Sequence, residues 1–183
     1  MLAASVAAQT PVRVRGTIVS INDKTMMVKS RDGRDVKLEL SDALTVAVAK
    51  AARFEDIKEG DFLGVTTQKR PDGSNVALEV HYLAPTVPEG QSASDLLPGS
   101  TMTNANVASK VTATGARELT LQFKNGSHQV AVPDGTPIVR TVPGTRTDLV
   151  PGEYVFLAAQ AAPDGALTAT RVQVSKDGVR PPQ

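Results

Sequence analysis

The chain contains no cysteine and no tryptophan, and only 3% of its 183 residues are aromatic. The absence of cysteine excludes disulfide bonds, zinc sites built on thiolates and cysteine nucleophiles. Because aromatic residues are scarce, a hydrophobic core must be built mainly from valine, leucine, isoleucine and alanine. Valine and threonine are frequent and long charged helical runs are absent, which favours strands over helices.

The sequence also lacks a strong charge of either sign and a long apolar run. Its 20 basic and 19 acidic residues leave a formal net charge of +1. No basic face of the kind that dominates nucleic-acid affinity is indicated, so we expect no nucleic-acid partner. No stretch of about 18 apolar residues is present, so we expect no membrane-spanning helix.

Signatures of common enzyme classes are missing as well. The sequence has no Gly-x-Ser-x-Gly elbow, no Walker loop and no dinucleotide-binding fingerprint. We therefore expect a protein that is not an enzyme and that needs no cofactor.

The N-terminus is the part of the chain that bears on location. Residues 2–9 (LAASVAAQ) are similar to the last part of a secretory signal peptide, with Val6 and Ala8 at the small-residue positions before a cleavage site. The basic region and most of the apolar region of a signal peptide are missing, and the alternative interpretation is a frayed alanine-rich end. We expect a periplasmic or otherwise exported protein.

Two stretches of the sequence occur twice. Residues 56–62 (DIKEGDF) return as residues 148–154 (DLVPGEY), and residues 71–77 (PDGSNVA) return as residues 163–169 (PDGALTA). Both copies lie 92 residues after their counterparts. A constant spacing across two separate motifs indicates an internal duplication.

Alternating apolar residues and turn signals predict five or six short strands in each repeat, as expected for a small closed barrel. The predicted fold class is all-β, with two tandem small OB-like β-barrels that arise from the duplication; small β-sandwiches are the alternative. The predicted strands are 12–21, 25–30, 35–40, 44–50, 62–68 and 76–83, then 107–114, 118–123, 127–132, 137–142, 154–162 and 167–174.

Composition then divides the chain into segments. Residues 1–10 are a signal-peptide remnant or a frayed end, residues 11–84 the first barrel repeat, and residues 105–175 the second. Residues 85–104 are rich in proline, glycine and serine and are predicted to be a linker. Residues 176–183 are predicted to be a polar, frayed tail.

Four motifs of the first repeat carry a resemblance to a known family. They are residues 16–21 (GTIVSI), the pair Asp32-Gly33, residues 56–61 (DIKEGD), and Asp72-Gly73 followed by Ala77 and Val80. In these motifs the chain resembles a family of bacterial exported domains that is known only as a domain of unknown function and often occurs in tandem. The second repeat departs from the pattern at Ser109 and at Asn125. The resemblance implies an OB-like barrel outside the cytoplasm and supplies no catalytic residues.

The recurring acids allow two interpretations. Asp56 and Asp61 return as Asp148 and Glu153, so they could be cation ligands or residues that cap a turn. We favour capped turns, because two divergent copies usually keep what the fold requires. The repeated Pro-Asp-Gly is likewise interpreted as a tight turn, since it lacks the alternating oxygen ligands of a calcium loop.

The aromatic residue that ends the first motif occupies the same position in both copies. Phe62 and Tyr154 are therefore interpreted as core anchors rather than as platforms on which ligands stack.

The candidate metal ligands are His81 and His128, the only histidines of the chain. Together with methionines such as Met26, Met27 and Met102 they could hold copper or another soft ion; methionine in a barrel core is the ordinary alternative. The sequence thus favours a non-enzymatic exported binding or interaction module with an unknown protein or small-ligand partner. The alternative is a periplasmic metal-handling accessory protein that uses histidine and methionine ligands.

Overall fold

The computed structural model describes residues 11–113 and 116–182. The predicted signal-peptide remnant at residues 1–10 lies outside the described residues. The fold is all-β, as predicted, and no described helix is long and apolar enough to cross a membrane. The elements are β1 (Val12–Ile21), β2 (Thr25–Ser30), β3 (Asp35–Ala51), η1 (Phe54–Asp56), β4 (Phe62–Lys69), β5 (Asn75–Tyr82), β6 (Gly90–Ala93), β7 (Thr101–Ala113), β8 (Ala116–Phe123), β9 (Gly126–Ala131), β10 (Ile138–Gly144), η2 (Arg146–Asp148), β11 (Tyr154–Ala161) and β12 (Leu167–Val174).

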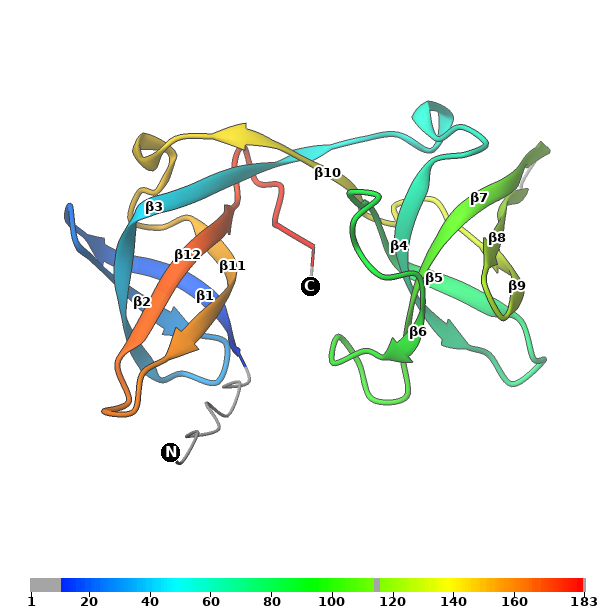
Figure 1. Ribbon diagram of the computed structural model, residues 1–183. Coiled ribbons are helices and arrows are strands. Elements are labelled where there is room, and N and C mark those ends of the chain that lie inside the picture. The colour runs from blue at the N-terminus through cyan, green and yellow to red at the C-terminus, as the bar shows by residue number, and fades with distance from the viewer. Residues whose placement is uncertain (1–10, 114–115, 183) are drawn as a thin grey trace, which may run out of the picture. The chain divides into compact units, whose positions relative to one another are not determined.

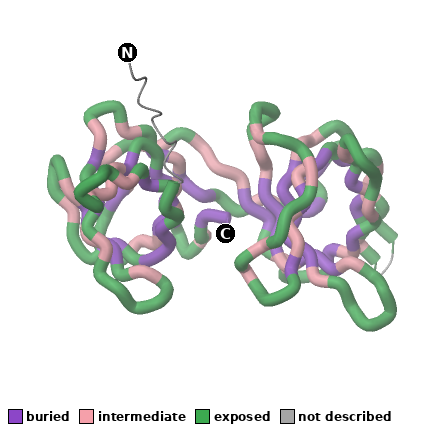
Figure 2. Tube along the Cα trace, turned by 60° about the horizontal axis from the view of Figure 1, so that its bottom comes forward, coloured by how far each residue is buried: buried purple, intermediate pink, exposed green. Residues whose placement is uncertain are grey.

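The chain forms two compact units (Figure 1). Unit 1 combines the chain up to Ala49 with Val142–Pro181, and unit 2 consists mainly of Lys50–Thr141. In both units most of the buried residues lie on the strands, while most connecting loops are exposed (Figure 2).

Unit 1 is a closed barrel of five strands. Strand β1 pairs with β2 and β11, β2 pairs with β3, and β11 pairs with β12, all antiparallel. Strands β3 and β12 run parallel and close the ring, with Val46 opposite Val172. The core is aliphatic apart from one methionine, Met26, and contains no aromatic side chain. A closed ring leaves no free sheet edge and excludes the sandwich alternative for this unit.

Unit 2 has the same kinds of pairing in a second set of strands. Strand β7 pairs with β4 and β8, β8 pairs with β9, and β4 pairs with β5, all antiparallel. Strands β5 and β9 run parallel and meet at one residue pair, Val76 and Ala131. The short strand β6 lies outside this set and pairs with β7. Phe54 is buried in the core, which is otherwise mainly aliphatic.

The compact units do not follow the predicted boundaries of 11–84 and 105–175. Strands β1–β3 of the first repeat join β11 and β12 of the second repeat, whereas β4 and β5 join β7, β8 and β9. The reason lies in β3, which is one strand of 17 residues instead of the two strands predicted on either side of residues 41–43. No glycine or proline interrupts residues 35–51, so the chain runs on out of unit 1 instead of turning back.

The 92-residue spacing persists in the structure. The helix η1 and strands β4 and β5 correspond, residue for residue, to η2, β11 and β12. The counterpart of β3 is divided into β9 and β10, because Pro133 and Pro137 cannot continue a hydrogen-bonded ladder. The predicted linker at residues 85–104 also differs: it contains β6, and β7 begins within it at Thr101.

The repeated motif at residues 56–62 and 148–154 is a capped turn, as predicted. Asp56 accepts the backbone N–H of Arg53 at 3.0 Å, and Asp148 accepts that of Thr145 at 2.9 Å. Gly60 and Gly152 have φ angles of 86° and 94°, in a region that glycine enters without strain. These glycines let the chain turn into β4 and β11.

Candidate functional site

The two predicted metal ligands lie in different places in unit 2. His81 is buried on β5, and His128 is half-buried on β9, where its ring lies 5.3 Å from that of Phe123. From the parallel pair of Val76 with Ala131, His81 lies five residues forward and His128 three residues back. Eight residues along parallel strands correspond to ~26 Å, at about 3.3 Å per residue. The structure therefore does not bring the two histidines into one site.

The methionines do not complete a metal site either. Met26 is fully buried in the core of unit 1, and the sulfur of Met102 accepts a hydrogen bond from the Thr66 hydroxyl at 3.7 Å. Within residues 11–113 and 116–182, no group of three or more histidine, aspartate or glutamate residues could hold a metal ion.

His81 has a packing role instead. Its Nδ1 lies 3.5 Å from Oε1 of Glu79, and both side chains are about nine-tenths buried. Its ring occupies the space above the backbone of Gly64, its partner on β4, so that a Cβ at Gly64 would overlap the imidazole. The glycine at this position is explained by the close approach of the ring.

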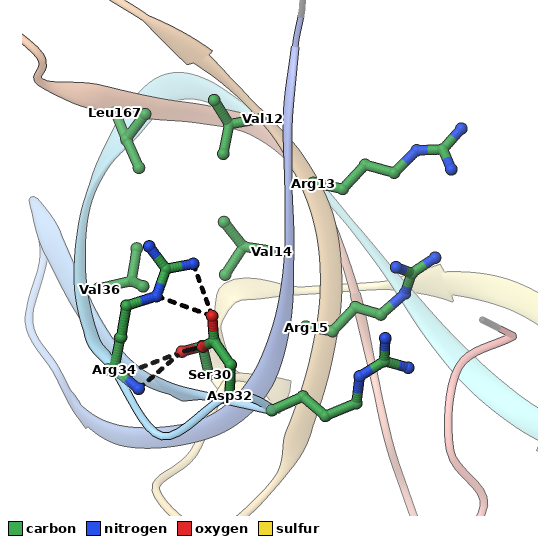
Figure 3. Close-up of a pocket in the computed structure, with 10 residues that line it drawn as sticks. Val12, Arg13, Val14, Arg15, Ser30, Asp32, Arg34, Val36 and Leu167 are labelled. Atoms are coloured by element: carbon green, nitrogen blue, oxygen red, sulfur yellow. Dashed lines mark hydrogen bonds and ion pairs between the residues drawn. The ribbon is translucent and has the colours of Figure 1, made fainter. Parts of the chain in front are cut away.

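One end of the unit 1 barrel carries a pocket of about 230 Å³ (Figure 3). Arg13 and Arg15 point to the opposite side of β1 from Val12 and Val14, whereas Arg34 lies on the side of the apolar residues. The pocket is lined by Val12, Arg13, Val14, Arg15, Ser30, Arg31, Asp32, Arg34, Val36 and Leu167.

Two of the charged residues that line this pocket, Asp32 and Arg34, are paired with each other. The guanidinium of Arg34 lies 2.7 Å from Oδ2 of Asp32, and the hydroxyl of Ser30 also donates to that carboxylate. The hydrogen bonds from Arg34 and Ser30 lower the pKa of Asp32 to about 2. This pair closes the hairpin between β2 and β3, and we regard the pocket as a minor feature.

A second surface feature, in unit 2, involves the repeated motif directly. It is a pocket of about 530 Å³ that we call the Phe62 groove. Its lining combines aromatic and carboxylate side chains with short apolar residues of the segment that follows β5. The lining residues are Gly60, Asp61, Phe62, Tyr82, Leu83, Pro85, Val87, Glu89 and Asn106.

Phe62 is not the core anchor that the sequence indicates. Its side chain is half-buried and belongs to neither core, while the buried aromatic residue of unit 2 is Phe54. The same correction applies to Tyr154, which is half-buried beside unit 1's core. The two rings therefore present part of their surface outside the barrels.

The Phe62 groove has polar groups at defined positions. Asp61 accepts the backbone N–H of Lys58 at 2.8 Å, which fixes its carboxylate at the turn. The guanidinium of Arg140 lies 4.5 Å from the centre of the Tyr82 ring. Burial raises the pKa of Tyr82, and the nearby carboxylate of Asp61 adds to this effect. The groove thus combines apolar side chains with two carboxylate residues, and the guanidinium of Arg140 lies over the ring of Tyr82.

In unit 1 the equivalent aromatic residue, Tyr154, is covered by a cation of the segment that follows β12. The guanidinium of Arg180 lies 4.8 Å from the centre of the Tyr154 ring. Lys176 forms an ion pair with Asp148 at 2.8 Å, and the hydroxyl of Ser175 donates to Glu153. The tail predicted to fray is therefore held at residues 175–180.

The segments that follow β5 and β12 have the same backbone course. Leu83 donates its N–H to the carbonyl of Phe62 at 2.9 Å, and Ser175 donates to Tyr154 at 2.8 Å. Each segment then forms a turn, from Val87 to Ala84 at 3.0 Å and from Val179 to Lys176 at 2.9 Å.

The side chains of these segments differ at most positions, including both positions at which unit 1 has a cation. At the positions of the cations Lys176 and Arg180, unit 2 has Ala84 and Pro88. The Phe62 groove is therefore built like the Tyr154 position but without its two cations. This contrast was visible in the sequence at a spacing of 92 residues, yet only the structure shows that Arg180 lies on the ring.

Comparison with known proteins finds a family for one stretch of the chain. Residues 5–81 match the family of a domain of unknown function, DUF5666. This match confirms the predicted likeness to an unknown-function domain family over the first repeat. No curated protein and no solved structure matches the chain. The DUF5666 stretch contains β1–β4 and almost all of β5, so its strands are divided between the two compact units.

Proposed function

We propose that the chain is a non-enzymatic binding module that acts outside the cytoplasm, built from two OB-like barrels that a duplicated sequence forms by exchanging halves. In unit 1 the strands follow one another around the ring in the order β1, β2, β3, β12 and β11, with one parallel pair. This five-stranded order, with its parallel closure, is similar to that of the OB-fold. Unit 2 repeats the order with β7, β8, β9, β5 and β4.

The residue-for-residue correspondence of η1, β4 and β5 with η2, β11 and β12 supports the duplication. An exchange of halves follows if each repeat contributes its first three strands to one barrel and its last two to the other. The signal-like residues 2–9 and the likeness to an exported family support a place outside the cytoplasm.

The Phe62 groove is the observation that carries the binding function. Concave sites that combine aromatic side chains with a few fixed polar groups are typical of ligand and partner binding. The groove holds the Phe62 ring, the carboxylate of Asp61 and the half-buried Tyr82 in one pocket of about 530 Å³. Metal handling through His81 and His128 is not proposed, since β5 and β9 hold these residues far apart.

A capture experiment tests the function. The full chain is immobilised and exposed to extracytoplasmic extract of the source cells, in parallel with the variants Phe62→Leu and Tyr154→Leu. We expect a ligand or partner that wild type and Tyr154→Leu retain and Phe62→Leu loses. Equal capture by all three proteins, or no capture by a folded wild type, would count against the Phe62 groove as the binding site.

A further inference from the structure

We infer that the Phe62 groove takes an arginine side chain of a partner protein, on the ring that corresponds to the one that Arg180 covers in unit 1. This inference rests on the proposed binding function and names the chemistry of its partner. The occupied Tyr154 position serves as an internal template, because both positions are built from the same motif and the same turn.

The template defines what the groove would recognise. In unit 1 a guanidinium lies on the face of Tyr154, and the adjoining segment donates a hydroxyl to the acid Glu153. Arginine above an aromatic ring is attracted by the electron-rich ring face. In the Phe62 groove, Phe62 replaces the tyrosine and Asp61 replaces the glutamate. The recognition elements remain, and the positions of the two cations are held by Ala84 and Pro88.

The charge around the groove agrees with a basic occupant. Asp61 and Glu89 both line it, and no lysine or arginine does. Arg140 lies over Tyr82, and no cation lies over the ring of Phe62 in the part of the chain that the structure describes. An incoming guanidinium would therefore enter a pocket lined by the half-buried Phe62 and by two carboxylate residues.

The backbone position that carries Arg180 in unit 1 is held in unit 2 by Pro88 of the chain itself. What unit 2 lacks is therefore the guanidinium side chain and not the segment. An arginine of a partner would reach the Phe62 ring from outside the turn formed by Ala84 and Val87.

The chain supplies its own probe for the test. A synthetic peptide with the sequence of residues 175–183 (SKDGVRPPQ) is titrated into the ¹⁵N-labelled full chain, and amide shifts are followed by NMR. A second peptide carries the substitution Arg180→Ala. We expect the first peptide to shift the amides of Phe62, Tyr82 and Asn106 in a saturable way. The second peptide should bind with an affinity about three- to thirty-fold lower, as the loss of a cation–π contact of ordinary strength implies.

Variants of the full chain localise the contact. Phe62→Leu keeps an apolar side chain without a π face, and Asp61→Asn keeps an acceptor for the Lys58 N–H, so both should remain folded. We expect each substitution to lower the affinity for the first peptide several-fold, while Tyr154→Leu leaves the shifts at Phe62 unchanged. Equal affinity for the two peptides, or shifts confined to the surroundings of Tyr154, would overturn the inference.

Two further outcomes are informative. The chain could form a concentration-dependent dimer in which Arg180 of one copy contacts Phe62 of another. This outcome would identify the occupant as a second copy and overturn the inference of a separate partner protein. An absence of peptide binding, with Phe62-dependent capture from extract retained, would overturn the arginine inference and leave the binding function standing.

Discussion

Gly152 donates its backbone N–H to the carbonyl oxygen of Ile18 at 2.9 Å, although the two residues lie in different repeats of the sequence. Ile18 in turn donates to the carbonyl of Glu153 at 2.9 Å. The same pair of bonds joins Gly60 and Asp61 to Val107 in unit 2. Each copy of the repeated motif therefore attaches to the first long strand of the other repeat, and the exchange of strands can be tested by chemistry.

An engineered disulfide tests this pairing directly. Arg13 on β1 lies opposite Ala158 on β11, both are exposed, and the chain has no other cysteine. Opposite residues of antiparallel strands have Cα atoms about 4.5–5.5 Å apart, within the range of a disulfide. We expect the Arg13→Cys/Ala158→Cys variant to form an intramolecular disulfide, seen as faster migration in non-reducing electrophoresis.

The matched control for this disulfide uses the other repeat. Thr66 lies 92 residues before Ala158 and would face Arg13 if each repeat closed on itself. We expect Arg13→Cys/Thr66→Cys to stay reduced as a monomer. Efficient crosslinking of this control would mean that the halves are not exchanged.

Separated repeats give a second prediction. Residues 11–84 contain three strands of unit 1 and two of unit 2, and residues 85–182 contain the complementary strands. We expect the two fragments, when co-expressed, to form a 1:1 complex, measurable by size-exclusion chromatography with light scattering. Each fragment alone should self-associate, as expected when exchanged elements lack their partner. Two folded monomeric fragments that do not bind each other would contradict this arrangement.

The contact between Gly64 and His81 predicts a steric effect. A methyl group at Gly64 would overlap the buried imidazole, so Gly64→Ala should destabilise the fold by about 1–3 kcal/mol, the usual cost of overpacking. Urea denaturation measures the change. In the background of His81→Ala the same substitution should cost much less, because the overlapping ring is gone. An equal cost in both backgrounds would place the strain elsewhere.

The ion pair between Lys176 and Asp148 predicts a pH dependence. The hydrogen bond from Lys176 lowers the pKa of Asp148 below its ordinary value of 3.8, and Asp148 raises the pKa of Lys176 above 10.5. The unfolded chain therefore binds the carboxylate proton more readily, and the contribution of the pair is lost as pH falls through the lowered pKa of Asp148. It is also lost as pH rises above the raised pKa of Lys176.

Chemical denaturation at several pH values measures this effect. Wild type should exceed Lys176→Met in stability between about pH 5 and 9, and the difference should shrink below about pH 4. Lys37→Met, at an exposed site on β3, is the control. A difference that does not change with pH would exclude the ion pair as its cause.

Removing the cation from unit 1 predicts a gain of binding. Arg180→Ala uncovers the face of Tyr154, and the position then resembles the Phe62 groove. We expect this variant to show new NMR shifts around Tyr154 when the peptide of residues 175–183 is added, in addition to those at Phe62. No response at Tyr154 would indicate that an uncovered aromatic ring beside an acid is insufficient for recognition.

Local features were the predictable part of the structure. The turns at Asp56 and Asp148 follow from an acid and a glycine at fixed spacing, since a carboxylate caps nearby N–H groups and glycine permits positive φ. The all-β class follows from alternating valines and tight turns. These features depend on residues that are close together in the sequence, so a local sequence pattern is sufficient to predict them.

The partners of the strands were not predictable in this way. Strand β1 could pair with β4 or with β11, because Phe62 and Tyr154 begin strands that carry the same motif. The choice depends on whether β3 turns back, and residues 41–43 contain neither a glycine nor a proline to decide it. The Phe62 groove was missed for a related reason: an apolar residue after a glycine fits a core as well as a surface, and the contact of Arg180 with Tyr154 joins distant positions.

The order of the strands also determines how the molecule responds to force. The N-terminal strand β1 and the C-terminal strand β12 both belong to unit 1, and residues 50–141 of unit 2 lie between them in the sequence. Tension applied to the two ends is thus carried by unit 1, and unit 2 is loaded only after the strands β1–β3 or β11–β12 have separated. Unit 2, which contains the Phe62 groove, is therefore protected from tension that acts on β1 and β12.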